Sequence, residues 1–302
     1  MSSESKLSYI IGDIHGCYDE FRELEQVIFE NAEQQGKEAH VVCVGDIFDR
    51  GPKSADLCEH FLKGHDAGTH SLIMGNHEVE FLRILEALRP DLLENNALAF
   101  PFGSYTLQED YTADRYGSSI YEKIDQFKEM VFISWLSQGG HETLTSYNCN
   151  PHEFDSWAFP TEHLRFLTQL PYFWEDKLTL VTHAFATKED IKIVKKAEAA
   201  AKVQMSESIV LERDYQEAAE LDLEHAKTAI QSCLWSRVPP ENRPDSRRIH
   251  VSGHTPLEHV RVSKELGFIQ LDTGCVYGKR LTAYCPLYDS FFTVKSKTFW
   301  SR

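Results

Sequence analysis

The sequence has 302 residues and a formal net charge of −16 at pH 7, with 42% apolar and 26% charged residues. This length suits a single α/β domain with one large core, and the composition is typical of a globular protein in water. The negative charge repels phosphate backbones, so nucleic-acid binding is not expected. An anionic substrate would need local positive charge from arginines or metal ions.

Several missing sequence features predict a cytoplasmic protein. The first residues, MSSESKLSYIIGD, contain no basic segment followed by a long apolar one, so a secretory signal is not expected. No apolar run approaches the ~18–20 residues that span a bilayer. The seven cysteines form no CxxC pair, which favours reduced thiols over disulfides or a zinc ribbon. We expect each cysteine to be a small buried apolar residue.

Six short apolar runs along the chain each end in a cluster of Gly, Asp, Asn or His. Runs of four or five residues rich in Val, Ile and Leu and bounded by such clusters predict strands that are buried on both faces. The runs are residues 8–11, 40–44, 70–74, 177–181, 248–252 and 267–271.

Two amphipathic segments separate the first three runs. Residues 17–36 place Phe21, Leu24, Val27 and Ile28 at spacings of three and four, and the segment SADLCEHFLKG shows a similar pattern. Strands that alternate with helices predict βαβ units and a mostly parallel sheet. Ligands of such sheets bind beyond the carboxyl ends of the strands, where all six polar clusters fall.

The other segments differ in composition. Residues 92–170 are aromatic and polar, and we expect a mostly helical insertion beside the sheet. Residues 188–231 are rich in Ala, Glu and Lys without Pro or Gly, which predicts one or two solvated amphipathic helices. Residues 280–297 predict a β-hairpin or edge strands. Without an internal repeat or a linker, residues 1–302 are predicted to form a single domain with the two insertions.

Polar residues at the predicted strand ends have the chemistry of metal ligands. They are Asp13, His15, Asp46, Asp49, Arg50, Asn76, His77, His183 and His254. Imidazoles and carboxylate or amide oxygens bind Mn, Fe or Zn. Asp13 and His15, two residues apart in an extended segment, point the same way and can share one ion. Asp46 has two oxygens and can bridge to a second ion, which the asparagine and the last two histidines would complete.

Each of these residues alone also has a simpler interpretation. An aspartate in a Gly-Asp pair is commonly a turn residue or a helix N-cap, and this alternative stays open for Asp13. A single histidine after a strand is commonly a hydrogen-bonded structural residue. We assign the other ten histidines, such as His40, His60 and His259, to that class. The metal hypothesis depends on acids and imidazoles recurring at one end of one predicted sheet.

Three motifs carry a resemblance to a known family. GDIHG, GDIFDRG and GNHE, about thirty residues apart, resemble the three-part signature of the metal-dependent phosphoprotein phosphatases within the calcineurin-like metallophosphoesterases. The later histidines in VTHAF and SGHTP fall where that family places its last two ligands. GDIHGCYDE, DRGPKS, GGHETLTSY and DTGCVYGKRLTA are most similar to small bacterial members, which include serine/threonine phosphatases and nucleotide hydrolases. The resemblance covers nearly the whole chain, with the two insertions loosely matched.

The resemblance implies both a fold and a cofactor. The implied fold is α/β, with a β-sandwich core of mixed sheets flanked by helices and with helical insertions. The implied cofactor is a pair of metal ions, most simply Mn in vitro, with Fe or Zn as alternatives. Asp13, His15 and Asp46 match the ligands of the first ion. The matching ligands of the second ion are Asp46, which would bridge, Asn76, His183 and His254.

The resemblance also implies roles for the residues that would handle the phosphate. Arg50 matches a phosphate-binding arginine, whose planar fork suits two phosphate oxygens. His77 matches the general acid that protonates the leaving oxygen, with Asp49 holding its ring. Arg237, in CLWSRVPP, is similar to a second phosphate clamp in bacterial relatives. Stacking of Arg237 on Trp235, or pairing with a surface acid, stays open as an alternative.

Two residues depart from the family pattern. Phe48 replaces a small aliphatic residue in the second motif, and Phe185 stands where the family usually has glycine. Neither is a predicted ligand, so we expect the catalytic set to be intact. A benzyl group at either position is expected to change the shape of the substrate cleft or of its wall.

Three functional hypotheses follow. The first is a phosphomonoesterase that acts on phosphoserine or phosphothreonine in proteins, with phosphotyrosine also open, through attack by a hydroxide that bridges two metal ions. The second is a hydrolase of dinucleoside polyphosphates such as diadenosine tetraphosphate. Similar symmetrical hydrolases typically have GNHD and lack the Asp-Arg pair, so Asp49, Arg50 and Glu78 favour the first hypothesis. The third is a metal-free scaffold, which would be expected to have lost a ligand, and all six are present. The expected partner is a phosphorylated protein or small phosphoester, with no membrane.

Overall fold

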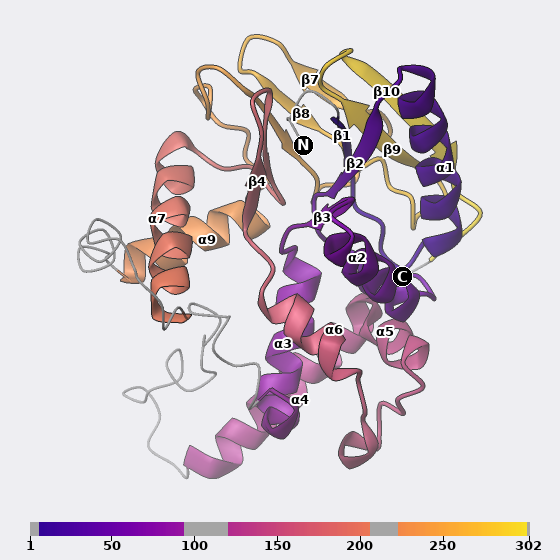
Figure 1. Cartoon of the computed structure of the whole chain (residues 1–302). Helices are drawn as coiled ribbons and strands as arrows, with labels where there is room; N and C mark the ends of the chain where they lie inside the picture. The colour runs from indigo at the N-terminus through magenta and orange to yellow at the C-terminus, as the bar shows by residue number, and fades with distance from the viewer. Residues whose placement is uncertain (1–5, 94–119, 206–222, 301–302) are drawn as a thin grey trace.

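Two five-stranded sheets form the centre of the computed structural model, which describes residues 6–93, 120–205 and 223–300 (Figure 1). The first sheet has the strand order β10-β9-β1-β2-β3, and the second has the order β4-β5-β6-β8-β7. The first contains β1 (Lys6–Ile11), β2 (Glu38–Cys43), β3 (His70–Leu72), β9 (Arg280–Cys285) and β10 (Ser290–Lys295). The second contains β4 (Phe173–Glu175), β5 (Thr179–Thr182), β6 (Ile249–Ser252), β7 (Arg261–Ser263) and β8 (Phe268–Gln270).

Both sheets are mixed. In the first, β1, β2 and β3 are parallel, β9 is antiparallel to β1, and β10 is antiparallel to β9. In the second, β5, β6 and β8 are parallel, and β4 and β7 are antiparallel edges. The six predicted strands and the C-terminal hairpin are confirmed. The expectation of one mostly parallel sheet is wrong, because the parallel strands divide into two groups of three. The implied core of two mixed sheets is confirmed.

A cluster of buried apolar side chains from both sheets packs them together. It draws on β1, β2 and β9 of the first sheet and on β5, β6 and β8 of the second. Its members are Ile10, Val42, Val44, Ile73, Val181, Val251, Ile269, Leu271 and Tyr284. The last three residues of β1, β2, β5, β6 and β8 are all buried, so both faces are covered there, and the predicted runs are continuously apolar rather than alternating.

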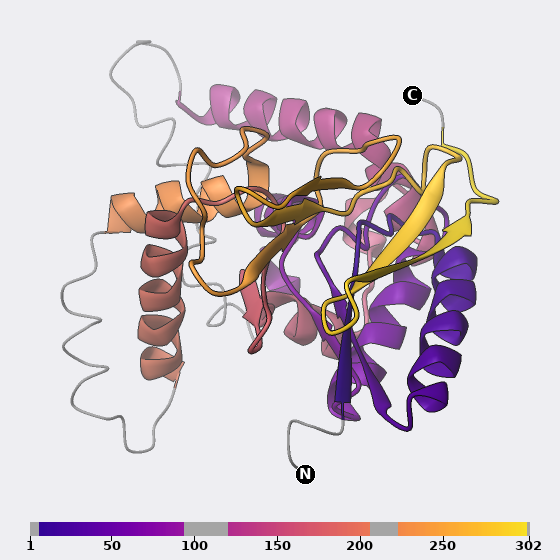
Figure 2. The same cartoon turned by 90° about the horizontal axis from the view of Figure 1, so that it is seen from above.

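Helices α1 (Tyr18–Gln34) and α2 (Ser54–Asp66) cover the outer face of the first sheet (Figure 2). In α1, Phe21, Leu24 and Ile28 face the core, as their spacing predicts. Val27 was expected on the same face but is 39% exposed. Val27 precedes Ile28 by one residue, so its side chain lies about 100° around the helix from that of Ile28 and points toward solvent.

The remaining helices lie mainly in the two predicted insertions. The first contains α4 (Ile120–Trp135), a kinked segment (Leu136–Gly140), α5 (His141–Ser146) and α6 (Thr161–Thr168). The second contains α7 (Lys188–Met205) and α9 (Leu223–Trp235), which pack on each other. Helix α3 (Asn76–Leu88) follows the third strand, and short 3₁₀ turns cover Pro90–Leu92 and Phe154–Ser156. The parts of the predicted insertions at 94–119 and 206–222 lie outside the described residues. The single-domain organisation stays a prediction.

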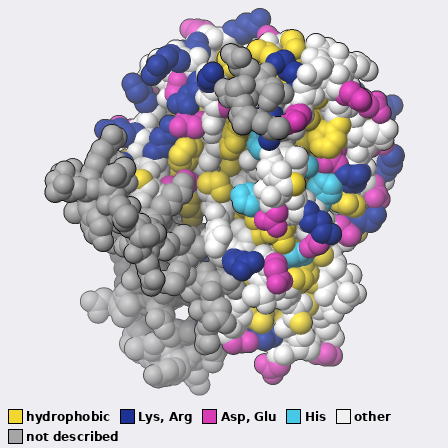
Figure 3. Space-filling view, in the orientation of Figure 1, with side chains coloured by type: hydrophobic (Ala, Val, Ile, Leu, Met, Phe, Trp, Pro, Cys, Tyr) yellow, Lys and Arg dark blue, Asp and Glu magenta, His cyan; other side chains and the backbone are white. Residues whose placement is uncertain are grey.

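The surface and the cysteines agree with the composition. All seven cysteines are buried and free, as predicted. None of the helices in the described ranges combines the length and apolar character that crossing a bilayer requires. Basic and acidic side chains are interspersed over the face seen in Figure 3. The net negative charge is therefore not gathered into one acidic patch on that face.

Packing between the two sheets can be tested with Ile10→Ala. Ile10 is fully buried in the inter-sheet cluster, so the substitution leaves a cavity and should lower the free energy of unfolding by about 2–5 kcal/mol. Val262→Ala on edge strand β7, where the side chain is 46% exposed, should cost less than about 1 kcal/mol. Urea unfolding of both variants makes the comparison, and equal losses would contradict the assignment of the core.

Candidate active site

The loops after five strands bring the predicted polar residues together beyond the carboxyl ends of those strands. Loops after β1, β2 and β3 arrive from the first sheet, and loops after β5 and β6 arrive from the second. Eight of the side chains are at most 7% exposed. They are Asp13, His15, Asp46, Asp49, Asn76, His77, His183 and His254. Because parallel strands end together, the two sheets contribute to one site.

Several of these residues have backbone angles in the left-handed region, which is uncommon for residues other than glycine. The angle φ is +45° at His15, +52° at Asp46, +68° at Asp49, +69° at Arg50 and +68° at His254. Such conformations cost about 1–3 kcal/mol each and persist where the surrounding structure holds them, typically at functional sites. The fold therefore maintains strain at the residues that are predicted to carry the chemistry.

Glu78, the third residue of α3, braces the loop that carries Asp46. Its Oε2 accepts hydrogen bonds from the backbone N–H groups of Asp46 (2.8 Å) and Gly75 (2.9 Å). Its Oε1 accepts from Ile47 (2.9 Å) and Phe48 (3.2 Å). Burial and the Asp46 charge raise the pKa of Glu78 to about 8, whereas these N–H donors favour its ionised form. Glu78 therefore fixes the backbone on which a central aspartate sits.

Asp46 lies at the centre of the cluster. Its Oδ2 is 3.4 Å from His183 Nε2, 3.5 Å from His15 Nε2 and 4.0 Å from His77 Nε2. Its Oδ1 accepts a hydrogen bond from the backbone N–H of His77 at 3.0 Å. Burial opposes the charge of Asp46, but the three imidazoles lower its pKa below the ordinary value. A carboxylate in this position is placed to reach ions on either side of it.

The hydrogen bonds of His183 define its tautomer. Its Nδ1 donates to the carbonyl oxygen of Val44 at 2.9 Å, so Nε2 of the neutral ring carries a lone pair. Burial lowers the pKa of His183 and favours the neutral ring. That lone pair faces two acceptor oxygens, Asn76 Oδ1 at 2.8 Å and Asp46 Oδ2 at 3.4 Å. Acceptors that face one another repel unless a cation lies among them, so this geometry fits a metal site.

His15 and His254 meet the same requirement for neutral imidazole. His15 Nδ1 donates to the carbonyl oxygen of Phe48 at 2.7 Å, which leaves the Nε2 lone pair facing the cluster. Burial lowers the pKa of His15, and burial next to His183 lowers the pKa of His254 to about 3. His254 Nδ1 lies 2.9 Å from Asn76 Oδ1. Neutral imidazole is the form that binds metal ions.

Asp13 and Asp272 are further carboxylates of this buried region. Asp13 accepts hydrogen bonds from the backbone N–H of His254 at 3.1 and 3.0 Å. Burial, together with the charges of Asp272 and Asp46, raises the pKa of Asp13 well above its usual range. Burial also raises the pKa of Asp272 to about 6. Bound cations would remove this repulsion, and a set of carboxylates, imidazoles and one amide suits Mn, Fe or Zn.

His77 and Asp49 form a hydrogen-bonded pair beside Asp46. His77 Nδ1 donates to Asp49 Oδ2 at 2.6 Å. Asp49 also accepts from Trp135 Nε1 at 3.0 Å and from Thr143 Oγ1 at 2.6 Å, which fix its position. Burial lowers the pKa of His77, but the charges of Asp46 and Asp49 outweigh burial and raise it. The ring is thus oriented, and these charges favour its protonated form more than in a free imidazole.

Arg50 presents its guanidinium to the same cluster. Its Nη1 and Nη2 donate to His15 Nε2 (2.5 Å) and His77 Nε2 (2.8 Å). Among the described residues, its buried Nε has no hydrogen-bond partner. The guanidinium carbon lies 5.7 Å from the ring centre of Tyr277 and 5.9 Å from that of Trp300. A planar cation held here, with donors in reserve, can accept phosphate oxygens.

Arg237 lies at the edge of the cluster rather than among its buried members. It is exposed, and its Nε donates to His254 Nε2 at 3.4 Å. The ring of Trp235 is 39% exposed and meets the His254 ring edge to face, with centres 5.9 Å apart. Arg237 is thus near enough to the predicted ligands for the second-clamp hypothesis to be tested directly.

The two phenylalanines that depart from the family pattern fill the core. Phe48 is fully buried and packs edge to face on Phe81, with ring centres 4.9 Å apart. Phe185 is 2% exposed and packs on Phe268 at 5.0 Å. Both rings therefore repack the interior, and neither projects into solvent above the polar cluster.

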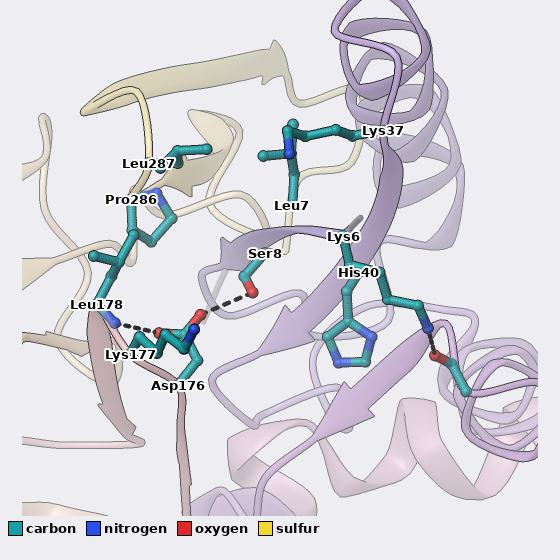
Figure 4. Close-up of a pocket in the computed structure, with 11 residues that line it drawn as sticks. Lys6, Leu7, Ser8, Lys37, His40, Asp176, Lys177, Leu178, Pro286 and Leu287 are labelled. Carbon is teal, nitrogen blue, oxygen red and sulfur yellow. Dashed lines mark hydrogen bonds between the residues drawn. The ribbon is translucent and has the colours of Figure 1, made fainter. Parts of the chain in front are cut away.

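A cavity of about 760 Å³ lies at the other end of the first sheet, near the beginnings of β1 and β2 (Figure 4). Its lining contains none of the predicted site residues. Ser8 Oγ donates to Asp176 Oδ2 at 2.9 Å, and Lys6 Nζ donates to the carbonyl oxygen of Gly68 at 2.9 Å. These polar groups satisfy one another, so the cavity offers no alternative catalytic set.

Comparison with known proteins identifies the class. The calcineurin-like phosphoesterase family model matches residues 8–206, more than half of the chain. The chain therefore belongs to the calcineurin-like phosphoesterase family, as the sequence motifs predict. The matched range includes the loops that carry Asp13, Asp46, Asn76 and His183, and it excludes His254.

The individual relatives have low sequence identity to this chain. A bis(5′-nucleosyl)-tetraphosphatase PrpE (asymmetrical) of Halalkalibacterium halodurans is 27% identical over 91% of this chain and 87% of its own length. A symmetrical bis(5′-nucleosyl)-tetraphosphatase of Nitrosococcus oceani is 34% identical over 27% of either chain. This chain spans about 30% of the length of several curated relatives that it matches. A cold-active protein-tyrosine phosphatase of Shewanella sp. is 20% identical, with a TM-score of 0.48 over 97% of this chain and 85% of that one.

Sequence reasoning missed the residues that hold the site in place. Trp135 and Thr143 fix Asp49, and Gly139 contacts Arg50 through its backbone. The segment FISWLSQGGHETLTSY contains all three, but its periodicity gave no reason to assign them to the site. Asp272 stands in the DTG segment after β8, at another strand end, where a carboxylate could have been added to the list.

Gly139→Ala tests the contact between the helical segment and Arg50. A Cβ at Gly139, where φ is +107°, would lie 2.2 Å from the backbone nitrogen of Arg50. We expect Arg50 to be displaced and kcat/KM for p-nitrophenyl phosphate to fall about 10²-fold, because small misplacements of substrate-positioning groups have effects of this size.

Gly36→Ala is the matched control for Gly139→Ala. Gly36 also has a positive φ, of +65°, but nothing lies within 4 Å of the added Cβ. It should cost about 1 kcal/mol of stability and leave kcat/KM unchanged. Thermal melts of both variants separate misplacement from unfolding. Equal activity in the two variants would show that Gly139 does not position Arg50.

Proposed function

We propose that the chain is a dimetal phosphoesterase that hydrolyses phosphomonoesters, with phosphoserine and phosphothreonine in proteins as the first substrates to test. The observation that best supports this proposal is the His77–Asp49 pair next to the Arg50 guanidinium. Asp13, His15 and Asp46 would hold one ion. Asp46 would be shared with the second ion, whose other ligands would be Asn76, His183 and His254. When bound, the pair of ions would supply an acidified water and charge stabilisation for in-line displacement at phosphorus.

Arg50 would bind the phosphate group. Its two terminal nitrogens face imidazole nitrogens that are better ligands for metal, and its Nε is unpartnered among the described residues. A phosphate dianion offers oxygens in the geometry of the guanidinium fork. Arg237, at the rim, would contribute a second positive charge. Arg50 and Arg237 would supply the local positive charge that an anionic substrate needs in a chain of net charge −16.

His77 would protonate the leaving oxygen. Asp49 accepts the Nδ1–H at 2.6 Å, so the Nε2 atom faces the cluster, where it accepts a hydrogen bond from Arg50 Nη2 at 2.8 Å. When Arg50 binds phosphate instead, Nε2 would be free to carry the transferable proton. The serine and threonine alkoxides are poor leaving groups and need this proton. An oriented acid therefore supports alkyl phosphate monoesters as substrates.

Dinucleoside tetraphosphates are the second candidate substrates. They are supported by the names of the relatives from Halalkalibacterium halodurans and Nitrosococcus oceani. The exposed ring of Trp235 next to His254 offers a surface on which a nucleobase can stack. The leaving group in that reaction is a nucleotide phosphate, which departs as a stable anion and needs a general acid less.

A direct comparison of substrates tests the proposal. The values of kcat/KM for a phosphoserine peptide, a phosphotyrosine peptide and diadenosine tetraphosphate would be measured with the same Mn²⁺-loaded enzyme. We expect the phosphoserine peptide to be hydrolysed faster than the dinucleotide. A higher kcat/KM for diadenosine tetraphosphate would reverse the order of the two candidates. No hydrolysis of any substrate with Mn²⁺, Co²⁺ or Fe²⁺ would favour the scaffold hypothesis.

His77→Gln tests the general acid through its dependence on the leaving group. We expect kcat for an alkyl phosphate to fall about 10²–10⁴-fold, because the departing alkoxide loses its proton donor. The loss for p-nitrophenyl phosphate should be much smaller, since that phenolate leaves without help. Metal content, measured in parallel, should be unchanged. Equal losses for the two substrates would show that His77 does not act as the acid.

A further inference from the structure

A second group of imidazole and carboxylate side chains lies beneath the helices on the outer face of the first sheet. Glu25 comes from α1, His60 from α2 and His70 from the first position of β3. Glu25 is 3% exposed and His70 is 5% exposed, while His60 is half-buried. His70 stands at the amino end of β3, whereas the proposed active site lies beyond the carboxyl ends of the strands. The two clusters are therefore separate.

The three side chains converge on one point. Glu25 Oε1 lies 2.9 Å from His60 Nε2 and 2.8 Å from His70 Nε2. The three candidate ligand atoms all lie within 4.8 Å of one another. In the proposed active site, Asn76 Oδ1 likewise lies 2.8 and 2.9 Å from imidazole nitrogens of His183 and His254. One oxygen that faces two imidazoles is thus a geometry that occurs twice in the described part of this chain.

The outward nitrogens of both imidazoles also have oxygen partners. His70 Nδ1 lies 2.9 Å from Thr69 Oγ1, and His60 Nδ1 lies 3.4 Å from Tyr18 Oη. Metal-binding histidines commonly use the ring nitrogen that does not face the metal in this way, which fixes the orientation of the ring. The two Nε2 atoms are therefore aimed at Glu25 by partners on the opposite side of each ring.

The charged residues that line the surface next to Glu25 are Arg22, which is basic, and three acidic side chains. Arg22, which is half exposed, pairs with the other oxygen, Oε2, and leaves Oε1 to the imidazoles. A surface hollow of about 620 Å³ along α1 reaches Glu25. Glu23, Glu30 and Glu33 also line this hollow and would attract cations to it.

We propose that Glu25, His60 and His70 form a third metal site, which binds Zn²⁺ or a similar first-row divalent ion and ties α1, α2 and β3 together. Two imidazoles and one carboxylate are a known three-ligand set for Zn²⁺, with water in the fourth position. The ligands come from separate elements of the fold, so binding stabilises the folded chain relative to the unfolded one. This site is independent of the proposed phosphoesterase reaction.

Zinc stoichiometry in a chain with a weakened active-site cluster tests the proposal. Asp46→Asn removes the charge of the residue shared by both proposed catalytic ions, and asparagine tolerates the positive φ at this position. The chelator-treated D46N chain would be titrated with ZnCl₂, desalted and analysed by mass spectrometry. We expect D46N to retain one more zinc per chain than D46N/H70Q. We also expect ZnCl₂ to raise the Tm of D46N by more than it raises the Tm of D46N/H70Q. The loss of a ligand should weaken zinc binding by more than about 100-fold.

His163→Gln is the matched control. His163 is equally buried and pairs with a single carboxylate, Glu59, at 2.8 Å, with Tyr147 Oη on its other nitrogen. D46N/H163Q should therefore retain the same zinc as D46N. If H70Q prevents folding, as judged by circular dichroism, D46N/E25Q replaces it. Equal zinc content in D46N and a folded variant of the site would show that Glu25 only hydrogen-bonds two histidines and would overturn the proposal.

Discussion

Negative charge that is buried without enough positive charge around it is the constraint on which the rest of the structure depends. Asp13, Asp46 and Asp272 lie in one buried region, where burial, together with the charges of Asp272 and Asp46, raises the pKa of Asp13. Burial lowers the pKa of the neighbouring His15 and His183 and so disfavours their charged forms. Metal cations would supply the balancing positive charge. This explains why ionisable residues stand at the ends of buried strands, where they would otherwise be costly.

The fold holds this arrangement rigid through groups that do not belong to the predicted ligand set. Glu78 binds four backbone N–H groups and shapes the loop of Asp46. Trp135 and Thr143 hold Asp49 from the segment that the sequence marks as an insertion. That segment therefore positions a residue of the predicted site and is not only a cover for the sheet. The strained backbone at the site persists because such contacts surround it.

Most of the architecture that positions the site follows from the sequence. The six apolar runs predict the parallel strands, since strands buried on both faces need no alternation, and their polar ends predict the cluster of Asp46, His183 and their neighbours. The division into two sheets was not predictable from periodicity, because it depends on which strands pair. The role of Trp135 depends on a contact with Asp49, 86 residues away in the chain, that no local pattern encodes. Considered alone in the sequence, His60 is predicted to be a structural residue. Only the fold brings it within hydrogen-bond distance of Glu25, next to His70.

Membership of the calcineurin-like phosphoesterase family and the geometry of the cluster both support the proposal of metal-assisted phosphoester hydrolysis. The proposed substrate class depends on the leaving group that His77 would protonate. The central claim is that six side chains enclose two cations with Asp46 shared between them. Crystals of the Mn²⁺-loaded chain, measured at a wavelength where manganese scatters anomalously, test it most directly. We expect two anomalous peaks beyond the carboxyl ends of the parallel strands, both within bonding distance of Asp46. A single peak, or none, or two peaks that do not share Asp46, would contradict it.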